Sequence, residues 1–307
     1  MMSQLTELVD DYYKSYDYRN LRDETKKQYQ YFISVMLNTE VDGQSLSTFD
    51  YTSLPTRVAK VAYNQWCEKG IHMANHVMSA TCIVFNHGLR MEMCVINPFA
   101  NVRRRTPERR KTVWGRDDIQ RFLDAAYSDF NTRNIGLIAH MAYAWCQRLG
   151  DMRLLEWESI NFDKQTVQIE QSKRKADVHL PIDDDLCDML KQQEEDFGFQ
   201  RYVAPRPYAI QGEFRPYSLH KLPAYARRVM DDAGLPKELR LSDLRRTGTT
   251  EMVEAGVGMA QIMSVTGHAN PSSVKPYMKN TLKSANLALT ERRIHATSTS
   301  TAAKESE

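Results

Sequence analysis

The chain has 307 residues, of which 42% are hydrophobic and 26% charged, and its formal net charge is only +2. These values describe a globular protein with room for about two domains. They exclude a disordered chain and a protein that binds nucleic acid through its overall charge, so any basic surface must be local. The five cysteines form no CxxC pair and no cysteine–histidine cluster at zinc spacing, which argues against disulfides and against a structural zinc site.

No segment of the sequence has the character of a membrane span or a signal peptide. The most apolar stretch, 135–146, is shorter than the roughly 20 residues that a membrane-spanning helix needs. The first residues, MMSQLTELVDDYY, are acidic and lack an apolar core. We therefore expect a cytoplasmic protein with no membrane partner.

The first 100 residues show helical periodicity and little strand signal. Asp23 is a suitable N-cap, and Pro55 stands where a helix can begin. The pattern predicts helices over the ranges 5–13, 23–36, 55–70 and 74–89. Residues 1–100 are therefore expected to form one small all-α unit.

A basic segment follows this unit. Between 101 and 116 it contains one acid, Glu108, and seven basic residues, namely Arg103, Arg104, Arg105, Arg109, Arg110, Lys111 and Arg116. A run of this kind can be a solvated linker or a connector that follows a phosphate backbone, and composition alone does not separate the two readings.

The remainder of the chain mixes helical and strand patterns. Helices are predicted over 116–127, 133–147, 184–196, 218–232, 243–256, 259–265 and 280–293. Three alternating stretches, 160–163, 166–170 and 178–181, predict antiparallel strands joined by hairpin turns. The fold class is therefore mainly α with a small antiparallel β-sheet, and the low-complexity tail at 296–307 is expected to be disordered.

Five residues in separate places have side chains suited to chemistry, although each also has an ordinary structural reading. Arg148 can cap a helix end, and Lys173 stands in a predicted turn where lysines are usually solvated. Arg245 lies in a first helical turn, where a positive charge opposes the helix dipole and favours an anionic partner. His268 is followed nine residues later by Tyr277, which can be a packing residue.

Together these side chains are suited to phosphate chemistry. Two arginines can clamp a phosphodiester through charged hydrogen bonds, and a lysine can protonate a leaving oxygen. A histidine can donate to a nonbridging oxygen, and a tyrosine hydroxyl can be the nucleophile. The sequence contains no carboxylate cluster of the two-metal type and no GxxxxGK[ST] loop, so we expect neither a metal nor ATP or another cofactor.

Four motifs in this order resemble the tyrosine recombinases, the phage integrase family. They are Arg148-Leu149-Gly150-Asp151, Glu170-Gln171-Ser172-Lys173, Asp243-Leu244-Arg245-Arg246-Thr247, and Thr266-Gly267-His268 with Tyr277. The resemblance covers about 113–290, whereas residues 1–100 resemble the family's helical core-binding domain only in length and pattern.

The resemblance implies an N-terminal all-α, SAM-like core-binding domain at 1–100, a basic linker at 101–112 and an α+β catalytic domain at 113–295. The two domains would clamp duplex DNA. The chain begins its helices almost at once, so we expect a simple integrase without an arm-binding domain. A helix at 280–293 would dock on a neighbouring subunit or pack on its own domain.

The resemblance also assigns roles to the site residues. Arg148 and Arg245 would hold the scissile phosphate, and His268 would hydrogen-bond to it. Lys173 would protonate the 5′-hydroxyl leaving group, while Tyr277 attacks and forms a 3′-phosphotyrosyl link. The supporting and DNA-contacting residues would be Asp151, which supports Arg148, and Arg103, Arg104, Arg105, Arg246 and Lys175.

One position departs from the family pattern. Ser242 stands three residues before the second arginine, where the family usually has histidine. A serine hydroxyl can donate a hydrogen bond to phosphate, but it cannot hold a proton at neutral pH as imidazole can. We count Ser242 among the catalytic candidates, with any proton-accepting role weakened or moved elsewhere.

The function expected from these observations is site-specific recombination by the integrase of a phage or another mobile element. Its partners would be duplex attachment sites, three further copies of the chain in a tetramer, and accessory proteins that bend DNA or set direction. The alternatives are a dimer-resolving recombinase of the Xer type, a catalytically impaired DNA-binding relative and a helix-turn-helix regulator.

Overall fold

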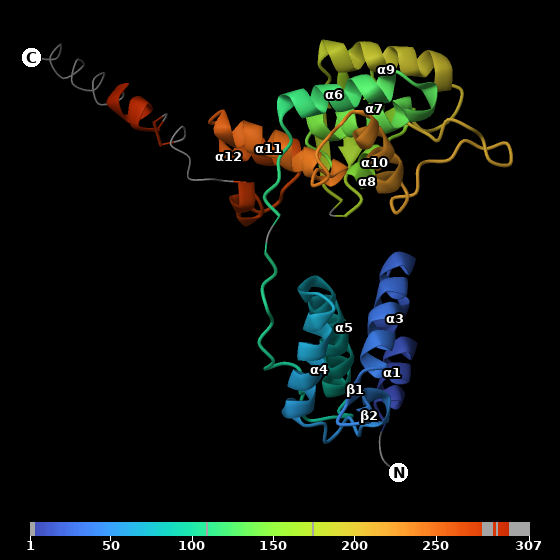
Figure 1. The fold of residues 1–307 in the computed structure, drawn as a ribbon, viewed down its shortest axis with the longest axis vertical. Helices are drawn as coiled ribbons and strands as arrows, with labels where there is room; N and C mark the ends of the chain where they lie inside the picture. The colour runs from blue at the N-terminus through green and yellow to red at the C-terminus, as the bar shows by residue number, and fades with distance from the viewer. Residues whose placement is uncertain (1–3, 109, 174, 278–284, 287, 295–307) are drawn as a thin grey trace, which may run out of the picture. The chain divides into compact units, whose positions relative to one another are not determined.

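A computed structural model describes residues 4–108, 110–173, 175–277, 285–286 and 288–294 (Figure 1). The chain divides into two compact units, Met1–Arg110 and Lys111–Glu307. Each unit has its own hydrophobic core. None of the helices in the described ranges is both long and apolar enough to cross a bilayer.

The N-terminal unit is almost entirely helical. Its elements are α1 (Leu5–Lys14), α2 (Tyr16–Arg19), α3 (Asp23–Leu37), β1 (Glu40–Val41), β2 (Gln44–Ser45), η1 (Leu46–Thr48), α4 (Thr56–Glu68) and α5 (Ile71–Arg90). The four predicted helices are present, but the periodicity missed α2 and the β1–β2 hairpin. Both are only one turn or two residues long, too short for a periodic pattern. Asp23 also proves to be the first residue of α3, and Arg22 is its N-cap.

Trp66 on α4 is the centre of the N-terminal core. Its side chain is only 2% exposed, and its indole Nε1 donates a 2.8 Å hydrogen bond to Thr39 Oγ1 just after α3. Its ring also stacks on Phe99, with 6.0 Å between the ring centroids and 8° between the planes. The indole thus joins two helices to the segment that follows α5, which extends the core beyond the last helix.

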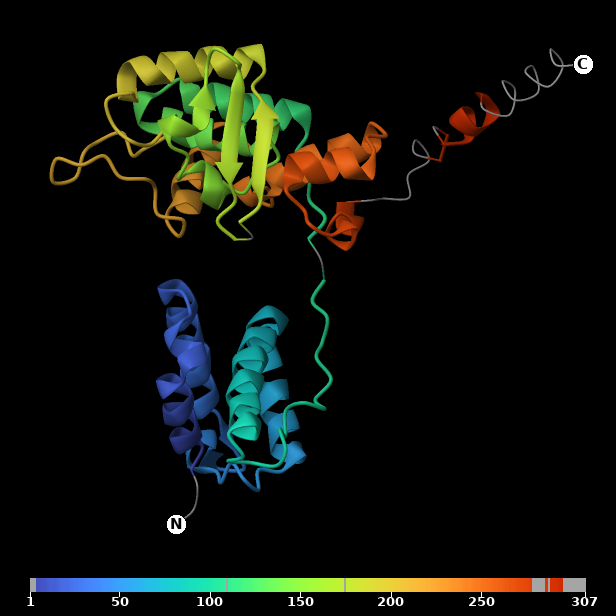
Figure 2. The same cartoon turned by 180° about the vertical axis from the view of Figure 1, so that it is seen from behind.

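The C-terminal unit combines helices with a three-stranded antiparallel sheet of order β3–β4–β5, seen in front of its helices in Figure 2. Its helices are α6 (Arg116–Tyr127), α7 (Phe130–Ala144), α8 (Leu149–Met152), α9 (Asp184–Phe197), α10 (Leu222–Asp232), α11 (Leu244–Glu254) and α12 (Met259–Thr266). Its strands and single 3₁₀ turns are β3 (Ile160–Asn161), β4 (Thr166–Glu170), β5 (Asp177–Pro181), η2 (Trp157–Ser159), η3 (Leu241–Asp243), η4 (Pro271–Ser273) and η5 (Lys275–Tyr277). The predicted fold class, mainly α with a small antiparallel sheet, is confirmed.

The register of the β4–β5 hairpin explains which side chains face the core. Val167 pairs with Leu180 and Ile169 with Val178, and all four side chains are buried. The backbone N–H of Gln171 then donates to the carbonyl of Ala176 at 2.8 Å and closes the loop. Because side chains alternate between the faces of a strand, the next inward position after Ile169 is Gln171.

The end of α7 differs from the sequence prediction in a way that shapes the site. The predicted helix ran over 133–147, but α7 ends at Ala144. Cys146 has a positive φ of 52°, and the Gln147 N–H returns to the carbonyl of Ala142 at 3.1 Å. Arg148 therefore has extended backbone at the N-cap of α8, and the reading in which it caps the C-terminus of a helix is wrong.

The basic segment after residue 100 is held at both of its ends. The Arg105 N–H donates to the Tyr63 hydroxyl at 2.7 Å, and Arg104 Nη1 donates to Ser79 Oγ at 2.8 Å, both within the N-terminal unit. Trp114 is anchored in the C-terminal unit, where its Nε1 donates to the Arg240 carbonyl at 3.0 Å. Two other predictions fall partly or wholly outside the described residues: the helix over 280–293, of which 285–286 and 288–293 are helical, and the tail at 296–307.

We predict that Trp66→Ala lowers the free energy of unfolding of the N-terminal unit by about 3–5 kcal/mol, the usual effect of truncating a large buried aromatic side chain. Urea unfolding of the full chain, followed by circular dichroism, measures the change. Lys60→Ala on the exposed face of α4 is the control and should unfold like the wild type. Equal behaviour of the two variants would contradict the assignment of Trp66 to the core.

Candidate active site

Four segments of the C-terminal unit meet around two arginines. They are the turn between α7 and α8, the β4–β5 hairpin, the first turn of α11, and the turn after α12. The first contributes Arg148, the third Arg245 and the fourth His268. The structure thus brings together three of the residues that the sequence predicted for phosphate chemistry.

Arg148 is held by neutral and acidic partners. Its Nη1 donates a 2.7 Å hydrogen bond to Gln171 Oε1, and the same nitrogen lies 3.7 Å from Asp151 Oδ2. The Asp151 side chain is only 2% exposed. Its other oxygen, Oδ1, accepts from the Ser172 backbone N–H at 3.1 Å and from Ser172 Oγ at 2.5 Å. Asp151 therefore supports both Arg148 and the base of the loop that carries Lys173.

Two buried glutamines connect three of the segments. Gln171 Nε2 donates to Gln147 Oε1 at 2.7 Å and to the Thr266 carbonyl at 2.8 Å. Gln147 Nε2 donates in turn to the carbonyls of Trp145 and Val265, at 2.8 and 2.7 Å. The sequence analysis missed both glutamines, although the strand alternation that places Gln171 inward was a usable signal.

Arg245 is more enclosed than Arg148. It is only 9% exposed, and its Nη2 donates to the Thr266 carbonyl at 2.8 Å and lies 3.3 Å from His268 Nε2. Its Nη1 is buried and donates to no acceptor in the described part of the chain. Burial, and after it the positive charge of Arg148, lower the pKa of Arg245, as expected where positive charge exceeds negative charge.

The hydrogen-bond network assigns the tautomer of His268. Thr266 Oγ1 donates its only proton to the Ile262 carbonyl at 2.7 Å, so it must accept from His268 Nδ1, which lies 2.7 Å away. The proton of the neutral ring is therefore on Nδ1. The Nε2 lone pair faces Arg245 Nη2 and can accept from it.

Tyr277 lies beside this cluster on η5, which the buried Val274 anchors. Its ring centroid is 6.1 Å from that of His268. The guanidinium of Arg246 lies 5.4 Å above the Tyr277 ring, at cation–π distance. Arg246, which the sequence analysis predicted as a DNA contact, thus also contacts the candidate nucleophile.

The other predicted residues lie farther out. Lys173 is exposed in the hairpin loop and forms no ion pair with the described residues, whereas Lys175 pairs with Glu170. Ser242 is exposed on η3 and lines a pocket of about 560 Å³ with Lys237 and Arg240. Arg103, Arg104 and Arg105 are exposed side chains of the N-terminal unit.

Asp243 occupies the N-cap position of α11 but does not cap the helix with its side chain. Its carboxylate instead accepts from the Arg240 backbone N–H at 3.1 Å. The carboxylate thus closes the turn that carries Ser242 and leaves the first N–H groups of α11 without a side-chain cap.

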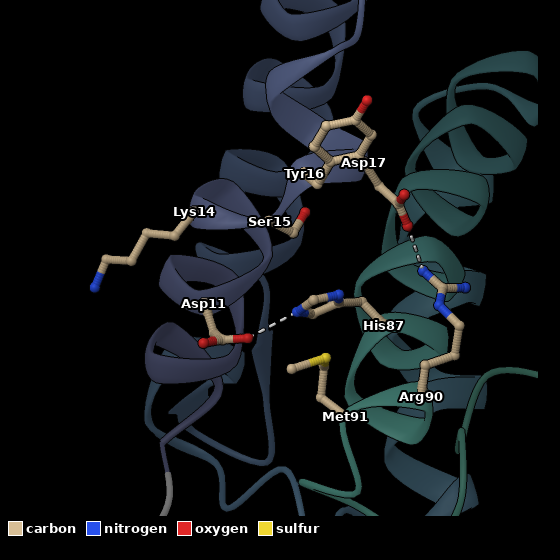
Figure 3. A pocket seen from close by; sticks show the side chains of 8 residues that line it. All are labelled: Asp11, Lys14, Ser15, Tyr16, Asp17, His87, Arg90 and Met91. Carbon is tan, nitrogen blue, oxygen red and sulfur yellow. Dashed lines mark hydrogen bonds and ion pairs between the residues drawn. The ribbon is translucent and has the colours of Figure 1, made fainter.

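A second pocket, of about 350 Å³, lies on the N-terminal unit between α1, α2 and α5 (Figure 3). Both of its carboxylates have a partner: Asp11 Oδ2 lies 2.7 Å from His87 Nε2, and Asp17 Oδ2 lies 3.1 Å from Arg90 Nη2. Within the described residues, no group of three His, Cys, Asp or Glu side chains could hold a metal ion. The arginine cluster, whose positive charge is only partly balanced, is therefore the stronger candidate for binding an anion.

We predict that Asp151→Ala lowers the free energy of unfolding of the C-terminal unit by about 1–3 kcal/mol, because it removes the acceptor of two Ser172 hydrogen bonds. The backbone amide of Ser172 should also exchange its hydrogen faster. Urea unfolding and hydrogen exchange measure the two effects. Asp188→Ala is the control, since this side chain is 81% exposed and its pair with Lys191 spans 3.8 Å. Unchanged exchange at Ser172 would contradict the assigned contact.

Comparison with known proteins identifies the family. Residues 114–283, more than half of the chain, match the model of the Phage integrase family. A tyrosine recombinase of Pseudothermotoga lettingae is 23% identical over 168 residues, which are 52% of this chain and 54% of that protein. Tyrosine recombinase XerA of Pyrococcus furiosus is 25% identical over 149 residues, 48% of this chain and 50% of XerA. The chain thus spans about half the length of the curated relatives it matches.

Solved structures share the fold. A chain of the lambda integrase dimer bound to a COC' core site superposes with a TM-score of 0.74 and 19% identity, over 90% of this chain and 77% of that one. The Tn1549 transposon integrase in complex with a circular intermediate DNA superposes with a TM-score of 0.76 and 14% identity, over 94% and 99% of the two chains. The resemblance inferred from the four motifs is confirmed, and the chain belongs to the phage integrase family, the tyrosine recombinases.

Proposed function

We propose that this chain cleaves and rejoins duplex DNA at specific sites through a covalent 3′-phosphotyrosyl intermediate on Tyr277. The observation that carries the proposal is the convergence of Arg148, Arg245 and His268 beside Tyr277. We further propose that the reaction integrates or excises the DNA of a phage or another mobile element.

The arginine cluster is suited to a phosphodiester. Arg245 Nη1 is buried without an acceptor among the described residues, which costs about 1–3 kcal/mol or more for a charged group. A nonbridging phosphate oxygen would accept from it and would offset the charge that Arg148 and Arg245 share. Both guanidiniums are planar forks that match phosphate geometry. Binding of the scissile phosphate thus relieves an unfavourable feature of the free protein.

The chemistry follows from these positions. The Tyr277 oxygen attacks phosphorus, the bond between phosphorus and the 5′ oxygen breaks, and Lys173 delivers a proton to that oxygen. The new phosphotyrosine ester retains the energy of the original linkage, so a 5′-hydroxyl from the partner duplex reverses the step without ATP. His268 can donate to the phosphate from Nε2 only when a second proton is on the ring, because Nδ1 already donates to Thr266.

Ser242 takes part in binding rather than in proton transfer under this proposal. Its hydroxyl can donate to a phosphate oxygen, and the nearby Lys237 and Arg240 add positive charge to the same pocket. A neutral hydroxyl does not take up an additional proton at neutral pH, so the proton of Tyr277 must pass to another acceptor or to water. Arg103, Arg104 and Arg105 would contribute sequence-independent backbone contacts from the N-terminal unit.

The partners are proposed from the related structures. The lambda integrase has been solved as a tetramer bound to a Holliday junction, and the Tn1549 integrase with a circular intermediate DNA. By analogy, we propose that four copies of this chain assemble on two duplex sites, with accessory proteins that bend DNA or set direction. Ser242, at the position where the family usually has histidine, favours this role over that of an Xer-type resolvase.

We predict that the wild-type protein forms a covalent adduct with a nicked duplex and that Tyr277→Phe forms none, because the variant lacks the nucleophilic oxygen. Nicked duplexes tiled from the DNA that flanks the gene, analysed on denaturing gels, provide the measurement. Tyr208→Phe, at a tyrosine that is 64% exposed in the same unit, is the control and should form the adduct. Specific binding by both proteins with no adduct from the wild type would instead indicate a DNA-binding relative that has lost catalysis.

We predict that Lys173→Ala slows cleavage of ordinary DNA by about 100- to 10,000-fold, the usual contribution of a general acid. A substrate with sulfur in place of the 5′ bridging oxygen should restore most of the rate, because a thiolate leaves without a proton. Single-turnover cleavage of both substrates gives the two rates. Lys164→Ala, at an exposed lysine in the turn between β3 and β4 of the same sheet, should cleave both substrates like the wild type. Equal defects of Lys173→Ala on oxygen and sulfur substrates would remove the lysine from the general-acid role.

A further inference from the structure

Two like charges lie close together in this site. The charge of Arg148 is the second-largest influence that lowers the pKa of Arg245, after burial. Asp151 Oδ2 lies 3.7 Å from Arg148 Nη1, and the other carboxylate oxygen, Oδ1, accepts hydrogen bonds from Ser172. Asp151 Oδ2 therefore offsets only part of the repulsion, and neutral hydrogen-bond acceptors between the two guanidiniums offset more of it.

A neutral chain of hydrogen bonds joins the two guanidiniums. Arg148 Nη1 donates to Gln171 Oε1 at 2.7 Å, and Gln171 Nε2 donates to the Thr266 carbonyl at 2.8 Å. Arg245 Nη2 donates to that same carbonyl oxygen at 2.8 Å. The two arginines are thus tied through one side-chain amide and one backbone carbonyl, both of which present acceptors to positive charge.

Only an amide side chain satisfies all the contacts at this position. Gln171 accepts from Arg148 with its oxygen, while the two protons on Nε2 go to Gln147 Oε1 and to the Thr266 carbonyl. A carboxylate would provide no donor, and an apolar side chain would provide neither function. Gln171 is also fully buried, so a lost partner is not replaced by bulk water.

The backbone next to Thr266 leaves room for this amide. Gly267 has a positive φ of 66°, and a Cβ at this position would come within 2.4 Å of Gln171 Nε2. A larger residue would displace the amide from the carbonyl that it shares with Arg245. The glycine before His268 is therefore required both by backbone conformation and by the approach of Gln171.

We propose that Gln171 is a positioning residue that holds Arg148 and Arg245 at phosphate-binding separation before the substrate arrives. The inference deepens the proposed function and rests on it, since it concerns the phosphate of the same site. Gln171 does not contact the substrate in this proposal and acts on it only by positioning Arg148 and Arg245. It lies two residues before Lys173, so the same contact also fixes one end of the loop that presents the lysine.

The test compares Gln171→Met and Gln171→Glu with the wild type, with Gln168→Met as the control on the exposed face of the same strand. Methionine keeps the length of the side chain and removes the hydrogen bonds. Single-turnover cleavage of the nicked duplex by Gln171→Met should be slower by about 10- to 100-fold, the usual effect of misplacing a group that orients the reacting phosphate. Gln168→Met should cleave at the wild-type rate.

The glutamate variant separates positioning from a general loss of structure. Its carboxylate can accept from Arg148 but cannot donate to Thr266, and protonation restores one donor. The cleavage rate of Gln171→Glu, divided by that of the wild type at the same pH, should therefore rise as the pH is lowered. A ratio that stays constant with pH would overturn the proposal, because a purely structural defect does not titrate.

A measurement without DNA keeps this inference distinct from the proposed function. Inorganic phosphate should raise the melting temperature of the wild type by binding between the arginines. The apparent dissociation constant for phosphate from this titration should be about tenfold higher for Gln171→Met than for the wild type. Wild-type phosphate affinity in that variant would overturn the role of Gln171. Failure of the wild type to form any DNA adduct, with the phosphate effect intact, would instead overturn the proposed recombinase chemistry alone.

Discussion

The carbonyl oxygen of Thr266 is the point on which the arrangement of the site depends. It accepts from Gln171 on the β-hairpin and from Arg245 on α11, both at 2.8 Å. The side chain of the same threonine fixes the orientation of His268. Because a carbonyl has two lone pairs, one backbone group can serve both segments at once. Three regions that are distant in sequence, the β4–β5 hairpin, α11 and the turn after α12, are thereby held around one small volume.

The constraint extends outward from that carbonyl through buried polar contacts. Gln147 and Gln171 satisfy each other and the carbonyls around them, and Asp151 ties Arg148 to Ser172. Such a network is stable only when every buried donor and acceptor has a partner. Two atoms of these residues lack a hydrogen bond: Asp151 Oδ2, an acceptor 3.7 Å from Arg148 Nη1, and Arg245 Nη1, the donor that a phosphate oxygen would satisfy. The unsatisfied donor thus coincides with the place where the proposed substrate would bind.

The N-terminal unit is stabilised differently. Its core is built from aromatic and aliphatic side chains that include Trp66, and the indole hydrogen bond to Thr39 is one of a few polar contacts within it. The hydroxyl of Tyr63, which is also buried, accepts a hydrogen bond from the backbone N–H of Arg105 and so holds the start of the basic segment. Hydrophobic burial stabilises this unit, whereas hydrogen bonds between segments determine the geometry of the active site.

The sequence by itself determined most of the helices, the alternating strands, and the family, because each of these depends on local spacing. Periodicity of apolar residues identifies a helix or a strand without knowledge of its neighbours. The order of the five site residues can likewise be read from the sequence without the structure. These residues are Arg148, Lys173, Arg245, His268 and Tyr277. Short elements could not be predicted in this way, and the sequence missed α2 and the β1–β2 hairpin. Elements of two to four residues are too short to show a periodic pattern.

Only the tertiary structure decided how the site is held together. Strand alternation indicates that Gln171 faces inward, but nothing local identifies the partners of Gln147 and Gln171. These partners are each other and backbone carbonyls up to 118 residues away. The early end of α7 depends on the positive φ of Cys146, which then allows Arg148 to leave the helix. Spacing along the chain specifies which groups are available, but the pairing of buried donors with acceptors is settled only when distant segments pack and exclude water.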